Sequence, residues 1–159
     1  MGEYGILMQD EMVRALLRPV GHPLRKRVTR RTSDQWAKRK VGDLLWVREC
    51  FATGGIVCPI GEAVYRATFD PKLAKLIRWK PGIHMPRWAS RLTYRIVGLW
   101  REPGLSLSRR RPLPEVDDDE AHREGVEGRA EYLALWEAIN GPVYPEMLWR
   151  IELEEVSRG

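Results

Sequence analysis

Cysteine is scarce in this chain: Cys50 and Cys58 are the only two among 159 residues, and no Cys-x-x-Cys pair occurs. Such sparse usage is typical of proteins kept in a reducing compartment, so we expect free thiols and a cytoplasmic protein. The histidines do not combine with the cysteines at the spacing of metal ligands. A structural zinc site is therefore not expected.

Long hydrophobic runs are also missing. No stretch approaches the about 20 apolar residues that a membrane span needs, and no basic-then-apolar leader opens the chain. The chain further lacks a glycine-rich phosphate loop, a Gly-x-Ser-x-Gly elbow and a Rossmann fingerprint. We therefore expect a soluble protein, without a membrane partner, that belongs to none of the enzyme classes these motifs mark.

Charge is abundant and unevenly distributed. The net charge is +5, but residues 1–112 carry 23 Lys and Arg against 9 Asp and Glu, whereas residues 113–159 carry 4 against 13. A basic body favours phosphate-bearing partners, although many basic surfaces are only solvated. Five cations fall within residues 25–31, and composition alone favours a flexible, solvated run there.

Hydrophobic periodicity predicts an α+β protein of one domain, residues 1–159. Helical spacing of apolar residues predicts helices over 9–18 and 130–139. Alternating or continuous apolar residues predict strands over 44–48, 62–69, 92–100 and 147–155, while 103–114 is expected to be a mobile basic loop and 117–120 an acidic helix start. Several strands with helices at the periphery suit a small closed or nearly closed sheet.

The most distinctive stretch, residues 79–93, is basic and aromatic at once. Its cations can meet phosphate and its flat rings can stack on bases, a combination that suits nucleic acid or a nucleobase. Basic and aromatic side chains also meet on surfaces that bind nothing, with a Trp ring under an Arg stem.

Four blocks of the chain, in the same order, resemble the ASCH (activating signal cointegrator homology) family in the form common in phage and prophage. They are the 79–91 block, a Lys-x-x-Thr-x-Arg motif at 26–31, a Gly-Asp-x-Leu-Trp-Val-Arg-Glu strand at 42–49 and an Ala-x-x-Glu-Gly segment at 121–125. The resemblance implies a PUA-like small β-barrel with helices near one mouth. The chain departs from the family at Leu24, where a glycine is usual.

The resemblance also implies a pocket in which Lys26, Thr29 and Glu124 lie together. In some ASCH members such a trio hydrolyses the acyl amide of N4-acetylcytidine. The chemistry is reasonable for these residue types, because a Thr hydroxyl needs a base, and a Lys crowded by other cations can lose its proton more easily. Glu124 could protonate the leaving amine or orient Lys26, and it would also raise the pKa of Lys26.

Residues around this trio are candidates for binding the substrate or nucleic acid. They are Arg25, Arg27, Arg30, Arg31, Trp46, Trp79, Lys80, His84, Arg87, Trp88 and Arg91. The tryptophans are at least as well explained by core packing. Glu49 is expected to hold an arginine in place through an ion pair.

Three functions are consistent with these features. The first is an amidohydrolase that acts on N4-acetylcytidine or a related modified nucleoside without a cofactor. The second is a binding module for RNA or DNA, and the third is a ribonuclease of single-stranded RNA that uses a divalent metal, for which the acidic run 117–120 is the candidate ligand source. A monomer is expected in each case.

Overall fold

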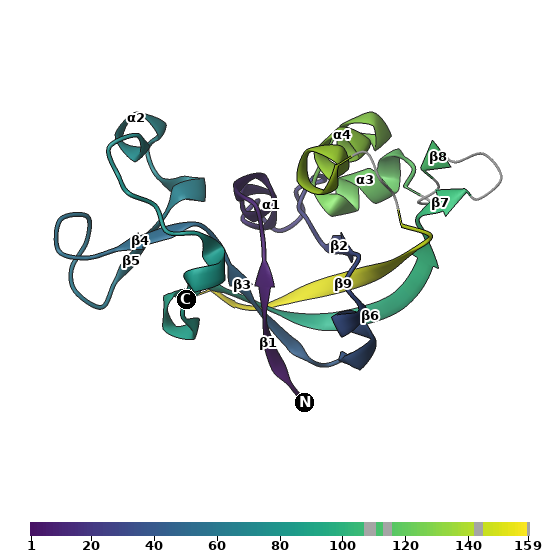
Figure 1. The fold of residues 1–159 in the computed structure, drawn as a ribbon, viewed down its shortest axis with the longest axis horizontal. Helices are drawn as coiled ribbons and strands as arrows, with labels where there is room; N and C mark the ends of the chain where they lie inside the picture. The colour runs from purple at the N-terminus through teal and green to yellow at the C-terminus, as the bar shows by residue number, and fades with distance from the viewer. Residues whose placement is uncertain (107–110, 113–115, 142–144, 159) are drawn as a thin grey trace. The chain divides into compact units, whose positions relative to one another are not determined.

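The protein combines one mixed β-sheet with short helices, as the computed structural model shows for residues 1–106, 111–112, 116–141 and 145–158 (Figure 1). The predicted α+β class is confirmed. The strands are β1 Glu3–Leu7, β2 Val28–Arg31, β3 Leu44–Arg48, β4 Phe51–Thr53, β5 Ala63–Tyr65, β6 Leu92–Pro103, β7 Leu105–Ser106, β8 Arg111–Pro112 and β9 Met147–Arg158. The α-helices are α1 Asp10–Leu16, α2 Pro71–Ala74, α3 Asp118–Glu124 and α4 Arg129–Asn140, and single 3-10 turns are η1 Asp34–Lys38, η2 Arg66–Thr68, η3 Gly82–His84 and η4 Arg87–Ala89.

Five strands are hydrogen-bonded in the order β1-β3-β6-β9-β2, and two small hairpins, β4-β5 and β7-β8, stand apart from this sheet. Within the described residues the order begins at β1 and ends at β2 without closing into a barrel, so the PUA-like barrel stays a prediction. None of the helices in that part of the chain is long and apolar enough to cross a membrane.

The residues cluster into two compact units. Unit 1 comprises 1–14, 43–95 and 155–158, and unit 2 comprises 15–42 and 96–154. Strand β6 belongs to both, since its first four residues lie in unit 1 and the rest in unit 2. A single domain over residues 1–159 is therefore still a prediction.

Unit 1 is built on β3, whose buried Leu45 and Val47 alternate with half-buried neighbours as a strand requires. Strand β1 pairs with β3 in parallel, and the start of β6 pairs with it antiparallel. A small cluster of Phe51, Met85 and Ala89 fills the space beside the β4-β5 hairpin. The strand predicted over 62–69 is wrong in its second half, because the chain turns at Arg66 and forms η2.

Unit 2 pairs β2 with β9 and holds α3 and α4 side by side (Figure 1). Their core contains Val116, Ala121, Tyr132, Trp136 and Leu148. Helix α3 begins where the Asp117 carboxylate accepts the Glu120 amide at 2.8 Å, which confirms the acidic helix start. Of the loop predicted over 103–114, residues 107–110 and 113–114 lie outside the described chain, and β7 pairs with β8.

Candidate functional site

The Lys-x-x-Thr motif lies at the start of β2, where backbone hydrogen bonds fix its register. Val28 and Thr29 pair with Glu152 and Ile151 of β9, and the Leu153 amide donates to the Arg27 carbonyl at 2.8 Å. Just before the strand, the Lys26 amide donates to the Ala15 carbonyl at 3.0 Å. Lys26 and Thr29 are thus held on rigid backbone within unit 2.

The end of α3 approaches Lys26 closely because of a glycine. Gly125 caps the helix with φ 90, a left-handed conformation that glycine adopts without strain. A Cβ on this residue would lie 2.5 Å from the Ala15 Cβ and 3.1 Å from the Lys26 Cβ. The Glu-Gly pair of the motif therefore has a physical basis: the glycine permits the approach that brings Glu124 to Lys26.

Lys26 and Glu124 form a buried ion pair. The Lys26 Nζ lies 2.7 Å from the Glu124 Oε2, and the two side chains are 1% and 5% exposed. Nζ also donates to the main-chain carbonyls of Val28 at 2.8 Å and Glu124 at 3.1 Å. Three acceptors surround the nitrogen, which matches the three hydrogens of an ammonium group.

Burial and charge act on Lys26 in opposite directions. Loss of solvent is the larger effect and lowers the pKa of the Lys26 ammonium below its ordinary value, while the Glu124 carboxylate raises it. The neighbouring cations Arg31 and Arg30 add smaller lowering contributions to this pKa. The cation crowding inferred from the sequence is present, but removal from water is the dominant cause.

The second oxygen of Glu124 binds Arg30. Arg30 Nη1 donates to the Glu124 Oε1 at 2.8 Å, so the two carboxylate oxygens are divided between an ammonium and a guanidinium. Arg30 Nε in turn donates to Glu102, and its Nη2 lies 3.8 Å from the Glu120 Oε1. Glu120 also accepts from Arg150 at 2.7 Å. The network fixes the orientation of the Glu124 carboxylate.

Thr29 is buried in β2, with 1% of its surface exposed. Successive side chains of a strand leave it on opposite sides, so Thr29 and Arg31 share one side of β2, and Val28 and Arg30 share the other. Burial lowers the pKa of Arg31 to about 10, and Glu124 opposes this shift. The structure thus joins Lys26 and Glu124 directly and places Thr29 three residues along the same segment.

The interpretation of residues 25–31 as a flexible, solvated run is wrong. Lys26 and Arg30 are buried, Arg25 and Arg31 are half-buried, and Arg27 alone is exposed. Carboxylates from distant parts of unit 2, Glu102, Glu120 and Glu124, neutralise Lys26 and Arg30, and the composition of the segment itself cannot reveal them.

The loop that departs from the family pattern is anchored by an arginine that the sequence did not single out. Arg18 Nη1 donates to the Leu24 carbonyl and, at 2.8 Å, to the Gly125 carbonyl. Glu102, Glu120 and Arg150 also belong to the site, and the sequence did not predict this role for them. The one available signal was that Glu102 is the first acidic residue after a stretch, 71–101, that has none.

The remaining candidates from the mid-chain block lie in unit 1, as does Glu49. Glu49 is the arginine-holding residue, and its partner is Arg91, which donates to its two oxygens at 2.8 and 3.0 Å. The Arg91 guanidinium also lies 4.1 Å from the centre of the Tyr65 ring. Burial raises the pKa of the Glu49 carboxyl, and Arg91 opposes that shift.

Some of the aromatic candidates contact other parts of the protein, and others are exposed. Trp79 donates to the Ala74 carbonyl at 2.9 Å and meets the Phe69 ring edge-on, and Trp46 lies under the guanidinium groups of Arg48 and Arg87. By contrast Trp88 is 58% exposed. His84 is exposed as well, Lys80 lies 5.9 Å from the Phe51 ring, and Arg87 pairs with Glu3 at 2.7 Å.

The acidic run 117–120 is largely occupied by contacts within the protein. Asp117 caps α3, Asp118 accepts the Arg129 amide at 2.9 Å, and Glu120 pairs with Arg150. Over the described ranges, no group of three or more His, Cys, Asp or Glu side chains is arranged to hold a metal ion.

The site of unit 2 therefore consists of a buried amine, a carboxylate shared with an arginine, and a buried hydroxyl on the adjoining strand. The amine and the carboxylate come from segments 98 residues apart. Comparisons of the chain with protein-family models, with curated proteins and with solved structures found no match.

Proposed function

We propose that this protein hydrolyses the acyl amide of N4-acetylcytidine or a related modified nucleoside, with Lys26 as base, Thr29 as nucleophile and Glu124 as proton carrier. One observation supports the proposal most: the buried contact of 2.7 Å between Lys26 and Glu124, next to the strand that carries Thr29. The resemblance to ASCH proteins, which also implies a PUA-like barrel, supports the same three residues.

The proposed reaction has two halves. In the first, neutral Lys26 takes the hydroxyl proton of Thr29, and the Thr29 oxygen attacks the acyl carbon. The bond between that carbon and N4 breaks, and the amine of cytidine leaves with a proton that passes from Lys26 through Glu124. In the second, water hydrolyses the acyl-threonine ester and releases the acid and free Thr29.

The protonation of Lys26 sets the condition for this chemistry. In the structure Nζ donates to three oxygens, so the amine needs one of these contacts to loosen before its lone pair can accept the Thr29 proton. Burial lowers its pKa and so favours the neutral form. Arg30, which holds the other Glu124 oxygen, keeps the carboxylate in place meanwhile.

A second candidate function is non-catalytic binding of RNA or DNA. It is favoured by the exposure of Trp88 and His84 close in sequence to Arg87, since exposed rings beside cations stack on bases and meet phosphate. Binding of this kind depends on salt and on the arginines, and it does not need the Thr29 hydroxyl.

The experiment that tests the proposal is incubation of the pure protein with N4-acetylcytidine and, separately, with single-stranded RNA, each with and without chelator. Products are separated by chromatography. Release of cytidine that chelator leaves unchanged supports the amidohydrolase. Shortened RNA that appears only without chelator supports the metal-dependent ribonuclease instead, and RNA retained intact on the protein, without turnover of either compound, supports the binding module.

A further inference from the structure

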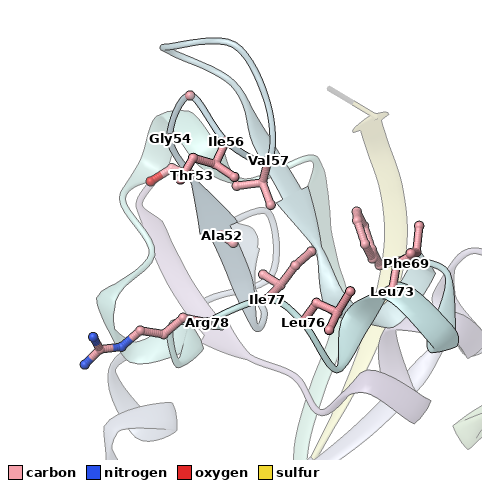
Figure 2. Close-up of a pocket in the computed structure, with 11 residues that line it drawn as sticks. Ala52, Thr53, Gly54, Ile56, Val57, Phe69, Leu73, Leu76, Ile77 and Arg78 are labelled. Carbon is pink, nitrogen blue, oxygen red and sulfur yellow. The ribbon is translucent and has the colours of Figure 1, made fainter.

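An apolar groove lies in unit 1, far in sequence from the residues proposed for hydrolysis. It has a volume of about 570 Å³. Thr53, the last residue of β4, forms one wall together with Ile56 and Val57, which follow the strand. Phe69, Leu73 and Ile77, around α2, form the other wall (Figure 2).

The aliphatic side chains at this groove are poorly covered by the rest of the protein. Ile56 is fully exposed, Leu76 is 82% exposed, and Leu73 is 51% exposed. Ile60, farther along the same loop as Ile56, is 93% exposed. Single exposed apolar residues are ordinary, but a cluster of them around a concavity marks a contact surface for another molecule.

Most charged side chains beside the groove are basic, and Asp70, which caps the start of α2, is an exception. Residues 71–80 contain Lys72, Lys75, Arg78 and Lys80 and no acidic residue. Figure 2 shows the Arg78 guanidinium extending away from the apolar side chains, toward the edge of the groove. Lys72, Lys75 and Arg78 are exposed, and no carboxylate in the described part of the chain forms an ion pair with them.

Three arginines elsewhere in unit 1, by contrast, each have a carboxylate partner. There, Arg66 pairs with Asp10, Arg87 with Glu3, and Arg91 with Glu49. Within the described chain, Lys72, Lys75 and Arg78 form no such pair and lie in the same segment as the exposed Leu73 and Leu76. A complementary molecule has to supply both anions and apolar side chains.

We propose that this groove binds an acidic, amphipathic segment of a partner protein. Apolar side chains of the segment enter between Val57 and Ile77, and its carboxylates meet Lys72, Lys75 and Arg78. This is helix-in-groove recognition, with anchors at i, i+3, i+4 and i+7. The site is independent of the proposed hydrolysis, because none of its residues takes part in that reaction.

The form of the groove favours a peptide over the other anionic partners. A nucleic acid strand presents sugars and phosphates and binds best where bases stack on aromatic rings, yet the exposed walls here are aliphatic. An anionic membrane favours a protruding apolar face rather than a groove with two walls. The apolar side chains of a peptide segment can enter and fill a groove of this shape.

A synthetic, fluorescein-labelled peptide of roughly 16 residues, with leucine at helical spacing and glutamate on the other face, is the probe. Its binding to the full chain is followed by fluorescence anisotropy. The Leu76→Ser variant should weaken binding about tenfold or more, because it removes an apolar anchor. Val20→Ser, which alters an equally exposed aliphatic residue elsewhere, should leave the affinity unchanged.

Charge reversal tests the other half of the proposal. Lys72→Glu combined with Lys75→Glu should lower the affinity for the acidic peptide about tenfold. The double variant should instead prefer a peptide with lysine in place of glutamate. Lys38→Glu, at another exposed lysine, should do neither. Circular dichroism of each variant confirms that it is folded.

Three results would overturn the proposal. The first is equal affinity of the wild type for the glutamate and the lysine peptide. The second is binding that the Leu76 and Lys72/Lys75 variants leave unchanged. The third is failure of the acidic peptide to bind while vesicles of phosphatidylglycerol, or oligouridylate, bind in a manner that the same variants abolish.

Discussion

The Lys26 Nζ lies 2.7 Å from the Glu124 Oε2, although 98 residues separate the two in the chain. Both side chains are almost fully buried, so the Lys26 charge depends on Glu124 for compensation, while Glu124 is compensated by Lys26 and Arg30 together. Their meeting is made possible by Gly125, which lets the end of α3 approach the backbone of Lys26. The same contact that stabilises the fold is the one proposed to move a proton.

Replacement of Glu124 should therefore destabilise the protein strongly. Glu124→Gln leaves the Lys26 ammonium and the Arg30 guanidinium without their shared carboxylate, and breaking a buried pair in this way costs about 3–5 kcal/mol. The measurement is the free energy of unfolding from urea titration. In the double variant Lys26→Met, Glu124→Gln, much of this loss should be recovered. A double variant no more stable than Glu124→Gln would contradict the interdependence of the two charges.

The lowered pKa of Lys26 predicts a particular dependence of stability on pH. The folded state binds fewer protons than the unfolded state between the lowered pKa and the ordinary value of 10.5. Stability contributed by this residue should therefore rise with pH through that window. The free energy of unfolding of the wild type minus that of Lys26→Met should increase as the pH rises toward 10.5.

The exposed residue Lys38 supplies the control for that experiment. The difference between wild type and Lys38→Met should stay flat over the same range. A difference for Lys26→Met that also stays flat, or falls, would show that Lys26 is not destabilised as an ammonium in the folded protein.

Gly125→Ala should disturb the site through its backbone. The residue has φ 90, and a Cβ would lie 2.5 Å from the Ala15 Cβ, so α3 would have to shift away from Lys26. We expect a loss of about 2–3 kcal/mol in the free energy of unfolding. Gly21→Ala is the matched control, since Gly21 has φ +86 but nothing within 4 Å of its Cβ position. That variant should cost only about 1 kcal/mol, and equal losses for the two would contradict the close approach.

Two ion pairs of unit 1 should differ greatly in their importance for stability. Arg91→Leu leaves the buried Glu49 carboxylate without its two hydrogen bonds and should cost about 3 kcal/mol or more. Arg87→Leu breaks a pair in which both side chains are about half exposed, and should cost at most about 1 kcal/mol. Thermal and urea unfolding of both variants compare the two directly, and similar losses would contradict the assigned burial of Glu49.

Much of the fold could be predicted from local pattern. Strand β3, helix α4 and the long final strand each show a clear period, and the structure confirms them. Strand β2 could not be found in this way, because Val28 is its one apolar residue and its burial depends on carboxylates supplied from elsewhere. The η2 turn at Arg66 was missed because the apolar alternation continues through it.

The candidate site, like the fold, was predictable only in part. Lys26, Thr29 and Glu124 were predicted through motif resemblance, since no local pattern links residues 98 apart. Arg30 was expected to meet a substrate, but it is held by Glu102 and Glu124. Long-range charge neutralisation of this kind has no signature within a single segment.

The measurement that tests the central claim most directly is release of cytidine from N4-acetylcytidine by the wild type and by Thr29→Val. Valine keeps the volume of the side chain and its preference for a strand but lacks the nucleophilic oxygen. The account predicts cytidine release by the wild type and its loss in the folded variant. Undiminished release by Thr29→Val would contradict it.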